Sequence, residues 1–144
     1  MPKRIQVTLD EIMCARAAKE INDGDVVFVG QGYPLLSSYL AKKTHAPKST
    51  IMTENGIIDF EAYRPLQHIG DLGSCKGASM CTDLAEIFSA NLFKGYVDVG
   101  FLSAAEIDRY GNMNTSYVKG VHFVGAGGAP DIGSYAKRTI ILIR

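Results

Sequence analysis

The chain has 144 residues, a length typical of one domain, and 47% of them are hydrophobic, which suffices for a buried core. Its 15 basic and 15 acidic residues cancel, which argues against a nucleic-acid binder that relies on phosphate contacts. The apolar stretches are strand-sized, whereas a membrane span needs about 18 apolar residues. The N-terminus lacks the apolar core of a signal peptide, and the three cysteines form no CxxC pair. We therefore expect a cytoplasmic, soluble protein with no nucleic acid and no membrane as partner.

The first half of the chain alternates helix and strand signals. Thr8 and Glu11 form a capping box that predicts the start of a helix, which Asn22-Asp23-Gly24 would end. Residues 26–29 are continuously apolar, as expected of a strand in a parallel sheet. After a glycine-containing turn, Pro34 lies in the first turn of the next predicted helix, and residues 50–53 form the next strand. The predicted apolar stripe of that helix consists of Leu35, Leu36, Tyr39 and Leu40.

The second half continues the same alternation after a segment that is hard to interpret. Residues 57–80 contain Pro65 and three glycines, Gly70, Gly73 and Gly77, and suggest a long excursion. The pattern then predicts a helix over 82–93, strands over 97–102 and 113–118, a helix over 130–136 and a strand over 139–143. Strands that alternate with helices predict an α/β fold, an open and mostly parallel sheet flanked by helices. We expect a single domain over residues 1–144.

The last predicted strand stops at Arg144 without a cap or a polar tail. Two interpretations stay open. Either this strand ends the sheet, or the sequence is the first part of a longer subunit that is truncated at its C-terminus.

Glu54 is the most informative candidate for chemistry. In open α/β sheets, ligands bind beyond the carboxyl ends of the strands. Glu54 is the carboxylate that directly follows a predicted strand end, and an Asn-Gly turn comes after it. A carboxylate in this place can act as a nucleophile or a general base, or it can be a solvated loop acid beside a turn.

Two glycine-rich loops would lie at the same edge of the sheet. Residues 125–129 precede a helix, and their small side chains allow the backbone to approach an anionic ligand closely. Residues 30–32 follow the first strand. Neither loop matches the GxGxxG fingerprint of dinucleotide-binding proteins. In the loop over 125–129, for example, Pro130 stands at the position of the third glycine of the fingerprint. A tight structural turn explains each loop about as well.

Other reactive side chains give weaker signals. Residues 73–77 match the GxSxG elbow with Cys75 as nucleophile, but the preceding residues make a poor strand. The three histidines and three cysteines show no spacing typical of metal ligands, so we expect no metal site.

The region around Glu54-Asn55-Gly56 resembles the family I CoA-transferases, in which the β-type subunits carry a Glu-Asn-Gly or Glu-Ser-Gly motif. Residues 23–35 resemble the first strand and GxGxP turn of that family. Residues 40–47, 104–114 and 125–131 resemble the glutaconate CoA-transferase β subunits in particular. The resemblance covers nearly the whole chain and implies the CoA-transferase (NagB-RpiA-like) fold.

This resemblance implies a function and a set of site residues. Glu54 would be the catalytic nucleophile of a ping-pong transfer, in which CoA moves from an acyl-CoA to a carboxylic acid through a glutamyl-CoA thioester. The residues implied to bind the substrate or CoA are Gly30, Gly32, Asn55, Gly56, Gly127, Gly128 and Ala129, with Gly30 and Gly32 in the same pocket. No cofactor would be permanently bound, because the coenzyme A thioester is a substrate. An α-type subunit would complete a heterodimer or heterotetramer.

Two alternatives remain at this stage. An acyl-CoA hydrolase of the same fold would use water in place of the acceptor, although the hydrolase relatives lack a glutamate at this position. A non-catalytic subunit would bind CoA or a partner without turnover. The acyl donor and acceptor are not indicated by the sequence.

Overall fold

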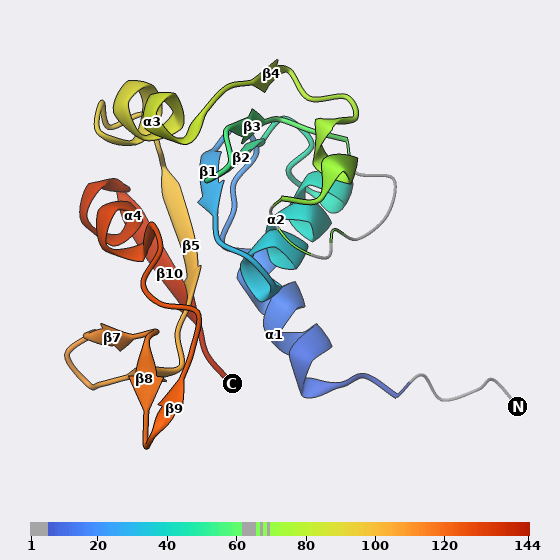
Figure 1. Cartoon of the computed structure of the whole chain (residues 1–144). Helices are drawn as coiled ribbons and strands as arrows, with labels where there is room; N and C mark the ends of the chain where they lie inside the picture. The colour runs from blue at the N-terminus through green and yellow to red at the C-terminus, as the bar shows by residue number, and fades with distance from the viewer. Residues whose placement is uncertain (1–5, 62–65, 67, 69) are drawn as a thin grey trace, which may run out of the picture.

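A computed structural model describes residues 6–61, 66, 68 and 70–144. Its main sheet has six strands in the order β10-β5-β1-β2-β3-β4 (Figure 1). The strands β10, β5, β1 and β2 are parallel, whereas β3 and β4 pair antiparallel at one edge. The predicted α/β class and the mostly parallel sheet are therefore confirmed. The strands are β1 (Val26–Val29), β2 (Thr50–Thr53), β3 (Ile57–Ile58), β4 (Met80–Cys81), β5 (Val99–Ser103) and β10 (Arg138–Leu142).

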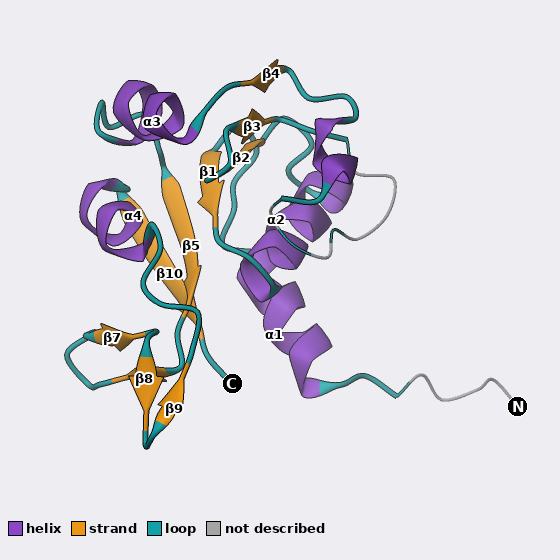
Figure 2. Cartoon of the chain, viewed as in Figure 1, coloured by secondary structure: helices purple, strands orange, loops and turns teal. Residues whose placement is uncertain are grey.

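Helices cover both faces of this sheet (Figure 2). The helices α1 (Leu9–Ala18) and α2 (Tyr33–Thr44) lie on one side, and α3 (Leu84–Glu86), the π-helix η2 (Ile87–Leu92) and α4 (Ala129–Tyr135) lie on the other. Two separate apolar clusters result, with Val27 and Val29 of β1 in the first and Phe28 in the second. Alternate residues of one strand therefore enter different cores, which explains why the strand is continuously apolar.

The helix starts agree with the sequence patterns. The Thr8 side chain accepts a hydrogen bond from the Glu11 N–H, and the Glu11 carboxylate accepts one from the Thr8 N–H, so the predicted capping box is confirmed. The first helix ends at Ala18, a few residues before the predicted stop. Pro34 lies in the first turn of α2, as predicted.

The predicted apolar stripe of α2 is wrong in part. Leu35 is buried, but Leu36 and Leu40 are 44% and 36% exposed. Ser37 and Ser38 lie in the interior instead. Their hydroxyls donate to the carbonyls of Tyr33 and Pro34 one turn earlier, at 2.7 and 2.9 Å, so these short polar side chains are buried with their hydrogen bonds satisfied.

Two segments differ from their predicted form. The helix predicted over 82–93 is present, but its second part is the π-helix η2. The strand predicted over 113–118 is instead split between two hairpins, because the Asn114 side chain accepts hydrogen bonds from the N–H groups of Ser116 and Tyr117 and bends the chain. The hairpins pair β6 (Glu106–Ile107) with β7 (Met113–Asn114), and β8 (Tyr117–Val118) with β9 (Val121–His122).

The excursion predicted over 57–80 returns to the sheet rather than leaving it. Its ends form β3 and β4, and a 3-10 helix, η1 (Leu72–Cys75), lies between them. Several residues of this excursion lie outside the described residues. No helix in the described part of the chain is long and apolar enough to cross a membrane.

Asp98 links the beginnings of three neighbouring strands. Its carboxylate accepts the Val26 N–H at 2.9 Å and a hydrogen bond from the Lys137 ammonium at 2.8 Å. The bond from Lys137 and that from Val26 hold the pKa of Asp98 below its ordinary value. A lowered pKa means that this carboxylate stabilises the fold above the ordinary carboxyl range and ceases to do so as the pH falls through its folded pKa.

We expect Asp98→Ala to lower the free energy of unfolding at pH 7 by about 1–2 kcal/mol, because the Val26 N–H loses its acceptor. The difference in free energy of unfolding between this variant and the parent chain should shrink on acidification below about pH 4. Denaturant unfolding at a series of pH values measures both effects. Lys137→Met, which leaves the Val26 bond in place, is the control and should cost less. A deficit independent of pH would contradict this account.

Candidate active site

The carboxyl ends of β1, β2 and β5 meet at one edge of the sheet and form a pocket of about 260 Å³. Glu54 follows β2 directly, and Gly30 and Ser103 mark the ends of β1 and β5. The loop after β9 closes the pocket from the other side. The residues that line it are Gly30, Gln31, Glu54, Leu102, Ser103, Thr115, Val124, Gly125, Ala126, Gly127 and Ala129. The parallel topology thus brings together segments that lie far apart in the sequence.

Glu54 is half-buried and makes one hydrogen bond to the glycine loop. The Gly128 N–H donates to Glu54 Oε1 at 3.3 Å, across 74 residues of sequence. Burial raises the pKa of Glu54 above its ordinary value, and the bond from Gly128 opposes this only in part. The charged form of Glu54 is therefore incompletely solvated, as is typical of functional carboxylates and also of some structural ones.

The raised pKa predicts a pH-dependent loss of stability. The folded chain favours the protonated form of Glu54, so its stability falls as the pH rises from the ordinary carboxyl range through the raised pKa. We expect Glu54→Gln to unfold at a higher temperature than the parent chain at pH 7–8, and at nearly the same temperature near pH 4. Thermal unfolding at both pH values tests this. A variant less stable than the parent at pH 8 would contradict it.

Gly128 has to be a glycine at this point of the fold. A Cβ on Gly128 would lie 2.7 Å from Phe88 Cζ and 2.8 Å from Glu54 Oε1. Its φ is −81°, which any residue can adopt, so the requirement is steric rather than conformational. The absent side chain is what allows the Gly128 N–H to reach the carboxylate.

Asn55 and Gly56 shape the turn that presents Glu54. Asn55 Oδ1 accepts a hydrogen bond from the Thr53 hydroxyl, and the Gly56 N–H donates to the Thr53 carbonyl at 3.0 Å. Gly56 has a φ of +85°, and its carbonyl accepts the Thr82 N–H at 2.8 Å. A Cβ at this position would lie 2.2 Å from the Thr82 carbonyl oxygen. Both residues therefore hold the turn in place, and neither is among the residues that line the pocket.

We expect Gly56→Ala to destabilise the chain by at least about 3 kcal/mol, because strain at positive φ adds to a backbone clash. Gly24→Ala is the matched control. Gly24 has a similar φ of +93° but no neighbouring atom within 4 Å of a Cβ, so this variant should cost only about 1–2 kcal/mol. Denaturant unfolding of both variants measures the difference, and equal losses would show that the clash with Thr82 does not matter.

A family model described as Coenzyme A transferase matches residues 11–144, nearly the whole chain. The chain belongs to this CoA-transferase family. It is 36% identical over 140 residues to the B subunit of 3-oxoadipate CoA-transferase from Pseudomonas knackmussii, covering 94% of this chain and 54% of that protein. It is 31% identical over 144 residues to the B subunit of glutaconate CoA-transferase from Acidaminococcus fermentans, with the same two coverages. The resemblance to the family and to its β-type subunits is thus confirmed.

Solved structures agree with the family assignment. The glutaconate CoA-transferase of Acidaminococcus fermentans superposes with a TM-score of 0.86 at 30% identity, covering 96% of this chain and 56% of that one. The decarboxylase AibA/AibB superposes with a TM-score of 0.83 at 29% identity, covering 94% and 59%. The chain spans about half the length of the curated relatives it matches. A fold shared by a CoA-transferase and a decarboxylase does not by itself define the reaction.

The glycines expected to bind the substrate in this CoA-transferase chain differ in position: some line the pocket of Glu54 or the cavity beside it, whereas Gly56 and Gly128 line neither. Gly30, Gly127 and Ala129 line the pocket with Glu54. Gly32 is not among these lining residues. Gly32 instead has a φ of +83° at the start of α2 and lines an adjacent cavity of about 590 Å³. The reason is geometric, because the chain turns into α2 between the two glycines.

Three polar residues of the pocket were not among the predicted site residues. Gln31 and Ser103 line both cavities, and Thr115 lines the pocket of Glu54. The positions of Gln31 between two glycines and of Ser103 after an apolar strand are signals that could have revealed them. Thr115 has no comparable signal, because the bend at Asn114 brings it to the pocket.

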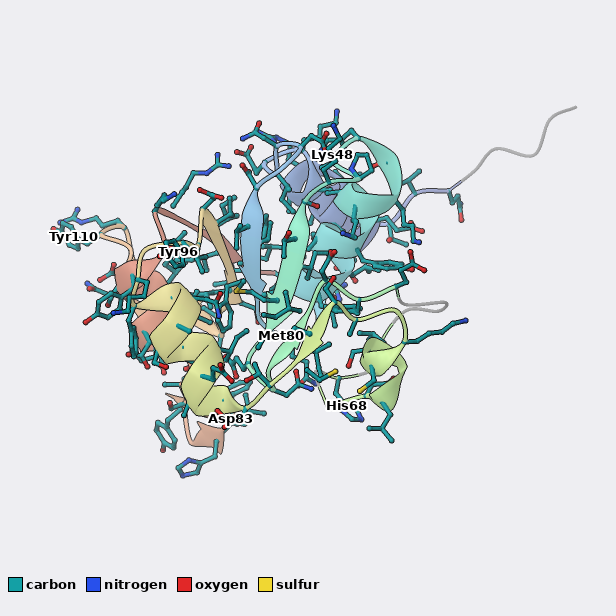
Figure 3. The ribbon with its side chains drawn as sticks, turned by 90° about the horizontal axis from the view of Figure 1, so that it is seen from above. Lys48, His68, Met80, Asp83, Tyr96 and Tyr110 are labelled. Carbon is teal, nitrogen blue, oxygen red and sulfur yellow. The ribbon has the colours of Figure 1, made fainter. Side chains whose placement is uncertain are left out.

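The weaker candidates from the sequence are not supported as sites. Cys75 lies exposed at the end of η1, which directly follows Gly70 in a turn and Asp71 rather than a strand. The neighbouring Ser74 is buried and donates to the Asp71 carbonyl. Figure 3 shows this region near His68, at the side of the molecule that carries η1. Within the described ranges, no group of three His, Cys, Asp or Glu side chains could hold a metal ion.

Proposed function

We propose that this chain is the catalytic β-type component of a CoA-transferase, in which Glu54 carries CoA as a glutamyl thioester between an acyl-CoA and a carboxylic acid. An α-type subunit would complete the enzyme as a heterodimer or heterotetramer, as the subunit names of the relatives suggest. The observation that carries this proposal is the Glu54 carboxylate, which is half-buried at the carboxyl edge of the sheet and bonded to the Gly128 N–H.

The first half of the reaction uses the carboxylate as a nucleophile. One Glu54 oxygen attacks the thioester carbonyl of the acyl-CoA, and the C–S bond breaks to give an acyl-glutamyl anhydride and CoA thiolate. The thiolate then attacks the glutamyl carbonyl carbon, and the acyl carboxylate leaves, so that CoA remains on Glu54 as a thioester. The second carboxylic acid reverses these two steps and departs as the new acyl-CoA. No water is consumed in the cycle.

The Gly128 N–H suits the second of these steps. When the thiolate attacks the glutamyl carbonyl, negative charge develops on an oxygen of Glu54 itself. The Gly128 N–H already points at Oε1, so it can stabilise this oxyanion without reorganisation. A well-aimed donor of this kind contributes about 3–4 kcal/mol. The Ala129 N–H already donates to the Ala126 carbonyl at 3.0 Å, so Gly128 is the better candidate of the two.

Intact-mass and peptide mass spectrometry tests the proposal. The chain is purified together with an α-type subunit and incubated with a panel of acyl-CoAs that includes glutaconyl-CoA and 3-oxoadipyl-CoA. We expect a CoA adduct that maps to Glu54, disappears on addition of an acceptor carboxylate, and identifies the donor. An adduct on the other subunit, or turnover without any adduct on Glu54, would contradict the proposal.

The same incubation separates the two alternatives. An acyl-CoA hydrolase would release free CoA at the same rate with and without an acceptor carboxylate. A non-catalytic component would form a stable complex with CoA or with its α-type partner, and would give neither an adduct nor turnover. Glu54 argues against the hydrolase because the hydrolase relatives lack a glutamate at this position, and against a non-catalytic component because such a component needs no desolvated carboxylate at the pocket.

A further inference from the structure

Phe88 and Glu54 both lie close to Gly128, and Phe88 is not among the residues that line the pocket. A Cβ built on Gly128 would lie 2.7 Å from Phe88 Cζ and 2.8 Å from Glu54 Oε1. The ring edge and the carboxylate oxygen are therefore neighbours beside Gly128. Phe88 is 7% exposed, so the surface that it presents beside Glu54 Oε1 is hydrocarbon that is itself closed off from water.

The π-helix holds the ring in this place. The Phe93 N–H donates to the Phe88 carbonyl at 2.9 Å, so that these two residues lie one wide turn apart. Their rings are 6.1 Å apart, the ring of Phe93 is 4.8 Å from that of Tyr135 on α4, and Phe28 on β1 lies 5.2 Å from Phe88. These four rings pack in a row between β1, η2 and α4, and Phe88 is the member of the row that lies beside Gly128. In Figure 3 the helix runs between the labelled Asp83 and Tyr96.

We propose that Phe88 is a positioning residue for Glu54, which holds the Gly128 amide against the carboxylate and excludes water from that side of it. This inference rests on the proposed role of Glu54 as nucleophile. A carboxylate with fewer water contacts loses less solvation when it attacks a thioester, so it reacts faster than an exposed one. A hydrocarbon ring supplies this effect without offering a competing hydrogen bond.

Neighbouring charged side chains do not account for the raised pKa of Glu54. The residues that line its pocket carry no other charged side chain. The titratable groups on α4 are Asp131 and Tyr135, and those on the α3 segment are Asp83 and Glu86. The raised pKa of Glu54 has burial as its largest cause, and the Gly128 hydrogen bond acts against it. The ring of Phe88 lies beside Oε1, where it can contribute to that burial.

Two variants of Phe88 and one matched control test the inference. Phe88→Leu and Phe88→Met remove the ring but keep an apolar side chain, and Met preserves most of the volume should Leu unfold the chain. Phe93→Leu removes the next ring of the same row and is the control. Carbon-13 NMR of the full chain follows the titration of the Glu54 carboxyl group and needs no partner or substrate. The rate of adduct formation against pH is then measured on the assembled enzyme.

We expect the Phe88 variants to lower the pKa of Glu54 toward its ordinary value and to slow adduct formation by about tenfold, with KM for the acyl-CoA nearly unchanged. Phe93→Leu should leave both the titration and the rate close to those of the parent. An unchanged titration in the Phe88 variants, or an equal change in Phe93→Leu, would overturn the inference. If the parent enzyme forms no adduct, the proposed function fails, whereas the titration still decides whether Phe88 desolvates Glu54.

Discussion

Replacing Glu54 by alanine is expected to lower kcat for CoA transfer by at least about 10³-fold, because Glu54 is the group proposed to carry CoA between donor and acceptor. Glu54→Asp should lose nearly as much, since its carboxylate is one methylene shorter and withdraws from the Gly128 N–H, which lies 3.3 Å from Oε1. Steady-state assays of the assembled enzyme, with the donor identified by mass spectrometry, measure both losses.

Glu106→Ala is the matched control for these variants. Glu106 is an exposed glutamate on β6 that accepts a hydrogen bond from Asn114 and lies outside the pocket of Glu54. Its replacement should leave kcat within about threefold of the parent. A Glu54→Ala enzyme that keeps more than about a tenth of the parent activity would show that another group carries CoA.

The second large effect is expected at Gly128. A methyl group there meets Phe88 Cζ at 2.7 Å and Glu54 Oε1 at 2.8 Å, so Gly128→Ala must push the ring, the carboxylate or the loop away. We expect a loss of about 10²-fold in kcat, from the displaced N–H donor, and a loss of about 1–3 kcal/mol in the free energy of unfolding from overpacking. Enzyme assays and denaturant unfolding of the same preparation measure the two losses.

Gly133→Ala provides the comparison within the same helix. A Cβ on Gly133 would lie 3.9 Å from Leu102 Cδ1, an ordinary contact, and alanine is the better helix former by up to about 1 kcal/mol. This variant should be as active as the parent and at least as stable. If Gly128→Ala and Gly133→Ala lose the same activity and stability, the loss at Gly128 comes from a general effect on the helix and not from the contact of Gly128 with Glu54.

Much of the fold could be predicted because its signals are local. The capping box at Thr8, the apolar run of β1 and the position of Pro34 each depend on a few adjacent residues, and all three predictions are confirmed. The failures have tertiary causes. Ser37 and Ser38 are buried because their hydroxyls bond within the helix, and the strand predicted over 113–118 is divided by the side chain of Asn114.

The candidate site divides in the same way. The sequence by itself determined that Glu54 follows a strand end, that an Asn-Gly turn comes next, and that the surrounding motifs resemble those of the CoA-transferases. Only the tertiary structure decided that Gly128, 74 residues later, donates to Glu54, that Gly32 lines a neighbouring cavity, and that Phe88 lies beside Gly128 and Glu54. The physical reason is that hydrogen bonding and desolvation depend on distances of a few ångströms between segments. A sequence motif specifies which chemical groups are present, whereas the packing of η2 and α4 against the sheet sets the distances between them.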